Sequence, residues 1–155
     1  MRYAGIIKND TSSGPGVCVS FFTQGCPFRC IGCQNPETWD FDGGKEFTDD
    51  VLDEVINSIN ANGILRPLCI MGGEPLCDEN LQLVETLIYT VKEVYPDLDI
   101  YLWTGYEYDD LVNDDSVQYI LENITCIIDG RFIIEKRDVT LPMRGSSNQT
   151  INYLT

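Results

Sequence analysis

Short apolar segments that end in a turn alternate with amphipathic helical segments along most of this 155-residue chain. A strand pattern, rich in β-branched, aromatic or other apolar residues, occurs in residues 17–23, 68–71, 100–103 and 126–128. A helical pattern follows Thr48, a plausible N-cap, and recurs in residues 81–91 and 117–122. Strands that are apolar on both faces and alternate with helices indicate a parallel sheet with right-handed crossovers.

The expected fold class is therefore α/β: a partial, open (β/α) barrel with a mostly parallel sheet. A closed eight-stranded barrel takes about 250 residues, so we expect a single domain over residues 1–155 with fewer strands. Each expected strand is followed by a turn or loop, at residues 24–44, 72–73, 104–105 and 129–130. Such folds build their sites at the carboxyl ends of parallel strands, so we expect these four points to converge on one cleft.

The cysteine and histidine content restricts the chemistry. No signal peptide or membrane span is recognisable, which predicts a cytoplasmic protein with reduced thiols. Seven cysteines in that compartment indicate metal binding, catalysis or burial. The absence of histidine excludes Ser-His-Asp and Cys-His hydrolases and histidine-containing zinc sites. The formal net charge of −15 argues against nucleic acid or an anionic membrane as partner.

Cys26, Cys30 and Cys33 form a C-x3-C-x2-C loop whose thiolates can point at one centre. Iron–sulfur clusters normally have four cysteine ligands, so three would leave one iron of a 4Fe–4S cluster open to a substrate. A zinc site is an alternative that needs a fourth ligand, and three buried, unliganded thiols are another. Spacing and compartment favour metal binding, with iron–sulfur ahead of zinc.

The other four cysteines have a different context. Cys18, Cys69 and Cys126 lie in apolar strand patterns, and Cys77 follows a turn. Burial is the favoured interpretation for each of them.

The cysteine spacing, together with Gly72-Gly73-Glu74-Pro75 after the next strand, resembles the radical S-adenosylmethionine (SAM) superfamily. This resemblance implies that the three cysteines bind a 4Fe–4S cluster, and that SAM chelates the open iron through its amino and carboxylate groups. It also implies that Gly72, Gly73 and Glu74 bind the SAM amino group through backbone and acidic side chain. Glycine does allow a backbone to approach a ligand closely.

A narrower resemblance covers nearly the whole chain and rests on residues 13–16, 32–39, 102–106, 128–131 and 144–149. These segments are similar to the family of anaerobic ribonucleoside-triphosphate reductase activating proteins. The resemblance implies an oxidoreductase that cleaves SAM reductively and generates a glycyl radical on the large subunit of the reductase. It also implies flavodoxin or ferredoxin as electron donor.

The resemblance implies further SAM contacts. Gly32, Cys33 and Gln34 are expected to line the cofactor, and Thr104 to lie at a strand end in the cleft. Radical SAM enzymes often have an aromatic residue where Gly32 stands, so the residue that packs on the adenine is not assigned. A simple turn is the alternative for Thr104.

Asp129 and Arg131 resemble an acidic and basic pair of related activases, in which the basic residue meets the SAM carboxylate. An exposed ion pair is the alternative for them. Residues 144–149 are a surface loop or part of the partner contact, and Trp103 is more typical of a core.

Two other functions remain open at this point. One is activation of a different glycyl-radical enzyme, such as pyruvate formate-lyase. The other is a non-catalytic iron–sulfur or zinc module, which would need a fourth ligand such as Cys18 or Cys77.

Overall fold

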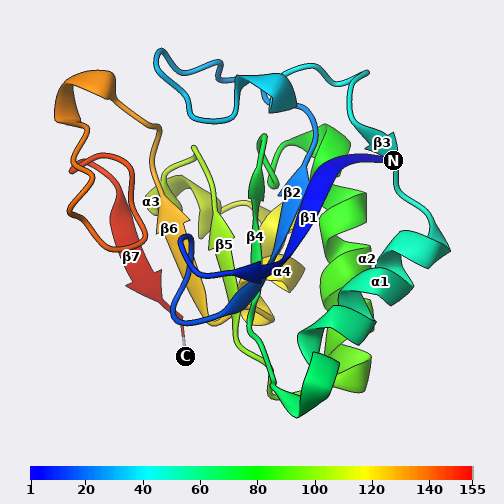
Figure 1. Cartoon of the computed structure of the whole chain (residues 1–155). Helices are drawn as coiled ribbons and strands as arrows, with labels where there is room; N and C mark the ends of the chain where they lie inside the picture. The colour runs from blue at the N-terminus through cyan, green and yellow to red at the C-terminus, as the bar shows by residue number, and fades with distance from the viewer. Residues whose placement is uncertain (155) are drawn as a thin grey trace.

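The computed structural model describes residues 1–154, which contain one seven-stranded sheet (Figure 1). Its strands are β1 (Arg2–Asp10), β2 (Cys18–Thr23), β3 (Lys45–Glu46), β4 (Leu68–Gly72), β5 (Ile100–Trp103), β6 (Cys126–Asp129) and β7 (Thr150–Tyr153). Their order across the sheet is β3-β1-β2-β4-β5-β6-β7. The α-helices are α1 (Asp49–Ile59), α2 (Asp78–Val94), α3 (Tyr108–Leu111) and α4 (Gln118–Glu122).

The four central strands, β2, β4, β5 and β6, are parallel neighbours. They coincide closely with the four strand segments that the apolar patterns predict. Figure 1 shows the loop between β2 and β3 above the carboxyl ends of these strands, beside the segment that follows β6. The centre of the sheet therefore presents its strand ends to the cysteine loop.

The prediction of a partial (β/α) barrel with a mostly parallel sheet is wrong. The sheet is mixed and does not close, because β1 pairs antiparallel with both β2 and β3, and β7 pairs antiparallel with β6. The sequence patterns missed these strands for a physical reason. They are short or partly exposed, so they lack the continuous apolar run of a strand buried on both faces.

Side chains of the central strands alternate between two buried faces of the sheet. The main core, on the face covered by α1 and α2, includes Leu68, Ile70, Ile100, Leu102, Val55 and Leu87. A smaller cluster on the other face contains Cys18, Cys69, Tyr101, Cys126 and Ile128, with Met71 and Trp103 against it. Both faces are buried, which explains the apolar strands without a barrel. Cys18, Cys69, Cys77 and Cys126 are all buried, as predicted.

The start of α1 and the end of α2 lie where local chemistry predicts. The Thr48 hydroxyl accepts a hydrogen bond from the Val51 N–H at 3.4 Å, which caps α1. The α2 helix ends at Val94, shortly before Pro96. Within residues 1–154, no helix is long and apolar enough to cross a membrane.

Candidate functional site

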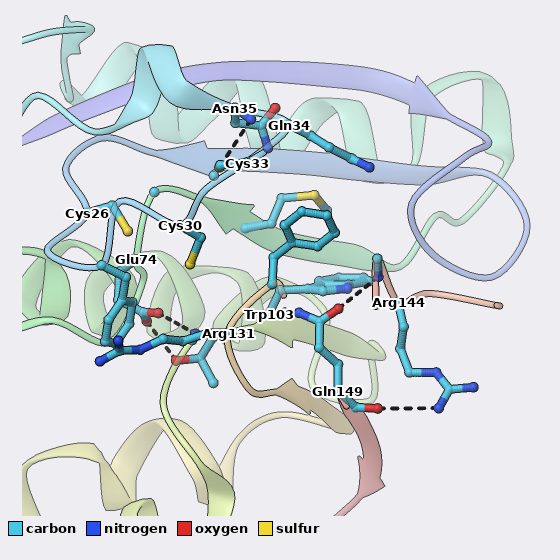
Figure 2. Close-up of a pocket in the computed structure, with 18 of the residues that line it drawn as sticks. Cys26, Cys30, Cys33, Gln34, Asn35, Glu74, Trp103, Arg131, Arg144 and Gln149 are labelled. Carbon is cyan, nitrogen blue, oxygen red and sulfur yellow. Dashed lines mark hydrogen bonds between the residues drawn. The ribbon is translucent and has the colours of Figure 1, made fainter. Parts of the chain in front are cut away.

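A pocket of about 450 Å³ lies at the carboxyl ends of the central strands, and we call it the site pocket (Figure 2). Nine of the predicted site residues line it: Cys26, Cys30, Cys33, Gln34, Gly72, Gly73, Glu74, Thr104 and Arg131. Gly105 and Gly130 complete the four predicted strand ends. The structure thus brings the cysteine loop together with residues at or just after the carboxyl ends of β4, β5 and β6 in one cavity.

Backbone hydrogen bonds close the cysteine loop at its base. The Gly25 N–H donates to the Thr38 carbonyl at 2.6 Å, and the Cys26 N–H donates to the Trp39 carbonyl at 3.2 Å. Inside the loop, the Cys33 N–H donates to the Cys30 carbonyl at 3.1 Å. The loop is therefore a closed unit that presents three thiols to the pocket.

The two glycines at the end of β4 lie close to the backbone of β2 and of the cysteine loop. Gly72 has a φ of +115°, and a Cβ there would lie 2.5 Å from the Thr23 nitrogen. A Cβ on Gly73 would lie 2.3 Å from the Gly25 carbonyl oxygen. The Glu74 N–H donates to that same Gly25 carbonyl at 2.9 Å. Backbone atoms thus come so close to Gly72 and Gly73 that a side chain at either position would clash with them, which explains why both residues are glycine.

The carboxylate of Glu74 is buried and joins two strand ends. It accepts hydrogen bonds from the Thr104 hydroxyl at 2.8 Å, the Gly105 N–H at 2.6 Å and the Leu76 N–H at 2.8 Å. Burial raises the pKa of Glu74 to about 7, although these three hydrogen bonds oppose the rise. A carboxylate offers about four lone-pair sites, so one of them is free for a further donor.

Phe28 forms a wall of the pocket that the sequence interpretation missed. It lies between Cys26 and Cys30 in sequence, and its ring packs edge-on against Tyr106 with centroids 4.8 Å apart. The guanidinium of Arg131 lies 4.3 Å from the Phe28 ring centroid. A Cβ on Gly105 would lie 2.6 Å from the same ring.

Two predicted residues, Gly32 and Asp129, are absent from the lining of the site pocket. Gly32 has a φ of +78°, and its Cα faces the side chain of Ile134. Asp129 is buried and accepts hydrogen bonds from the Tyr108 N–H at 2.6 Å and from the Thr150 hydroxyl. Asp129 therefore joins β6 to α3 and β7.

The half of the pocket away from the cysteines includes residues that the sequence interpretation did not assign to the site. Trp103, Arg144 and Gln149 line it (Figure 2). The Trp103 indole N–H donates to the Met143 carbonyl at 2.8 Å. Within the described residues, Nε of Arg144 is buried without a hydrogen-bond partner. The sequence interpretation placed Arg144 and Gln149 in a surface loop or a partner contact and Trp103 in the core, and only the fold shows that all three line the pocket.

The donor set of the cysteine loop is three thiols that line one pocket, Cys26, Cys30 and Cys33. Soft thiolates are the ligands that iron–sulfur clusters prefer, so this donor set fits such a cluster. Burial raises the pKa values of Cys26 and Cys30, and Arg131 opposes the rise at Cys30.

Comparison with known proteins identifies the family. The model of a family described as "4Fe-4S single cluster domain" matches residues 12–152. The anaerobic ribonucleoside-triphosphate reductase-activating protein of Vibrio cholerae serotype O1 is 39% identical over 156 residues, covering 100% of this chain and 99% of the relative. The chain belongs to the family of anaerobic ribonucleoside-triphosphate reductase-activating proteins.

Other reductase-activating proteins are similar over nearly their whole length. The protein of that name from Escherichia coli K12 is 35% identical, covering 99% of each chain. The one from Enterobacteria phage T4 is also 35% identical, covering 97% of this chain and 93% of the relative. The family membership of this chain therefore rests on full-length similarity to reductase-activating proteins and includes the cysteine loop.

Proposed function

We propose that this protein activates the anaerobic ribonucleoside-triphosphate reductase by radical SAM chemistry and generates a glycyl radical on its large subunit. The observation that carries the proposal is that Cys26, Cys30, Cys33 and Glu74 line one pocket in a chain of the activating-protein family. When bound, a reduced 4Fe–4S cluster supplies the electron for SAM cleavage, and that cleavage supplies the radical that removes a glycine hydrogen atom. Flavodoxin or ferredoxin provides the electron in this scheme.

The cysteine loop holds the cluster. Its base is tied by the Gly25 and Cys26 N–H groups, so Cys26, Cys30 and Cys33 belong to one small unit. Soft thiolates are the ligands that iron–sulfur clusters prefer. None of the other four cysteines lines the pocket. The pocket therefore offers no fourth thiol as a ligand for the remaining iron of the cluster.

The residues around the loop hold SAM. The free lone-pair site of Glu74, with the backbone of Gly72 and Gly73, receives the ammonium group. Arg131 stacks on Phe28, a position that leaves the N–H groups at the edge of its guanidinium for the SAM carboxylate.

Other predicted residues have supporting roles in this proposal. Cys33, Gln34 and Thr104 lie along the cofactor. Gly32 and Asp129 adjoin lining residues without lining the pocket, and we assign them positioning roles.

Aromatic side chains form part of the pocket wall, namely Phe28, Trp103 and Phe132. In this proposal their apolar surface limits the access of water to reactive species in the pocket. The chain contains no histidine, and the proposed chemistry needs no general acid or base.

The test is anaerobic reconstitution with iron and sulfide, reduction, and measurement of 5′-deoxyadenosine, methionine and the glycyl radical on the reductase. Cys30→Ala should lose both the cluster and SAM cleavage. Cys126→Ala removes a buried thiol outside the pocket and should retain the iron. SAM cleavage that persists in Cys30→Ala would contradict the proposed radical SAM function. Stoichiometric zinc without iron would instead favour the non-catalytic module.

A further inference from the structure

A second cavity, of about 730 Å³, lies between the cysteine loop and the segment after β6, and we call it the side cavity. Phe28, Cys30 and Arg131 line both the side cavity and the site pocket. The two cavities therefore adjoin at the residues nearest to the proposed cofactors. A group bound in the side cavity lies directly beside the proposed site of radical chemistry.

The side cavity has an exposed apolar rim. Ile31, in the cysteine loop, is 81% exposed, and Ile134, across the cavity, is 38% exposed. The two sides meet at Gly32, where an added Cβ would lie 2.6 Å from the Ile134 side chain. A single exposed isoleucine is ordinary in a soluble protein. Two of them on the rim of a cavity that adjoins the cofactor site are typical of a contact with another molecule.

Three exposed carboxylates, those of Glu107, Asp110 and Glu135, line the side cavity. Residues 107–115 contain five carboxylates and no lysine or arginine. The single salt bridge found within residues 1–154 joins Lys8 to Glu54, elsewhere in the fold. The acidic 107–115 segment therefore complements a basic partner surface.

Two cationic residues, Arg29 and Arg131, also line the side cavity, and both are exposed. Arg131 stacks on Phe28, and the Arg29 guanidinium lies 5.9 Å from the Trp39 ring centroid. The side cavity thus combines three exposed carboxylates, two exposed arginines, an apolar rim and lining residues shared with the site pocket.

We propose that the side cavity docks the glycine-bearing segment of the reductase, with basic residues of that segment against Glu107 and Asp110. The proposal rests on the proposed function, because the hydrogen atom to be removed must reach the site pocket. The backbone of a glycine can approach Cys30 and Arg131 closely, because glycine has no side chain that would clash with them. Ile31 and Ile134 form the apolar centre of the contact.

The test measures equilibrium binding of the intact reductase to the cluster-loaded protein with SAM, under anaerobic conditions and at equal iron content. Ile31→Ser and Ile134→Ser should each weaken binding by about tenfold. Ile64→Ser is the matched control, because Ile64 is 57% exposed and lies in the loop that enters β4 from the opposite end of the sheet. Its affinity should equal that of wild type.

A second pair of variants tests the charge. Glu107→Gln with Asp110→Asn should weaken binding and reduce its dependence on salt. Asp49→Asn with Asp50→Asn removes the same charge from the start of α1 and should leave binding unchanged.

The outcomes separate the two proposals. Equal affinities for wild type, Ile31→Ser and Ile134→Ser, with a normal glycyl-radical yield, would overturn the docking site and leave the proposed function standing. A wild-type protein that cleaves SAM but neither binds the reductase nor generates its radical would overturn the proposed function itself.

Discussion

At the scale of single residues, Glu74 connects the parts of the site. Its N–H donates a hydrogen bond to the Gly25 carbonyl, and its carboxylate accepts hydrogen bonds from the Thr104 hydroxyl and the Gly105 N–H. The same carboxylate is buried, and burial raises its pKa to about 7. Its charge therefore changes near neutral pH, in a pocket that we propose for a cationic amino group.

Glu74→Gln should change the pH dependence of SAM binding to the cluster-loaded protein. In wild type the carboxyl group is neutral below its pKa of about 7 and pairs poorly with an ammonium group. Affinity should therefore rise about tenfold from about pH 5.5 to about pH 7 as the group ionises. Equilibrium dialysis under anaerobic conditions measures this slope. Glu74→Gln should bind weakly at both values, and an unchanged slope in that variant would contradict the proposed contact.

Gly105→Ala should disturb the cysteine loop from outside it. The new Cβ would lie 2.6 Å from the Phe28 ring, so the ring must move and take the segment between Cys26 and Cys30 with it. Overpacking of this kind costs about 1–3 kcal/mol. Gly5→Ala is the control, because a Cβ on Gly5 meets nothing within 4 Å. Denaturant unfolding and iron content check both variants, and identical values would show that the ring adapts freely.

At the scale of elements, α2 is joined to the site through its first turn. Asn80 is buried, and its side-chain amide donates to the Glu74 carbonyl at 2.9 Å and to the Gly25 carbonyl at 3.3 Å. One helix residue thus contacts both the turn after β4 and the start of the cysteine loop. The position of the loop therefore depends on the packing of α2 against the sheet.

Asn80→Ala should lower the free energy of unfolding by about 1–3 kcal/mol, because it removes a buried donor from two carbonyl groups. Asn113→Ala is the matched control, since its amide makes only an exposed 3.4 Å contact with the Asp109 carbonyl. Urea denaturation compares the two variants with wild type. A loss in Asn80→Ala no greater than that in Asn113→Ala would mean that the two buried carbonyls do not need this donor.

At the scale of the whole molecule, charge is strongly unbalanced. The chain has 25 acidic and 10 basic residues. The described residues form one salt bridge, between partly exposed side chains of Lys8 and Glu54. Like charges on a compact surface repel each other, and this repulsion opposes folding.

Salt should therefore stabilise the protein. Screening of the net charge of −15 should raise the midpoint of thermal unfolding as sodium chloride increases from about 0.05 M to about 0.5 M. Scanning calorimetry of the cluster-loaded protein under anaerobic conditions measures this shift. A midpoint that falls with salt would show that attractive pairs outweigh the repulsion.

The sequence by itself determined features that depend on local spacing. The three cysteines lie in one short loop, so chain geometry alone keeps them near one another. The four central strands, the Thr48 cap and the end of α2 follow from apolar period, capping chemistry and proline. Each of these signals is contained within a few neighbouring residues.

Only the tertiary structure decided features that depend on contacts between distant segments. The antiparallel edges at β1, β3 and β7 make the sheet mixed, and they carry weak local patterns because they are short or partly exposed. Arg144, which the sequence placed in a surface loop or a partner contact, lines the pocket, whereas Asp129, which was expected to contact SAM, does not. The positions of Arg144 and Asp129 depend on how β6, β7 and the loop between them pack. The spacing of residues along the chain does not determine that packing.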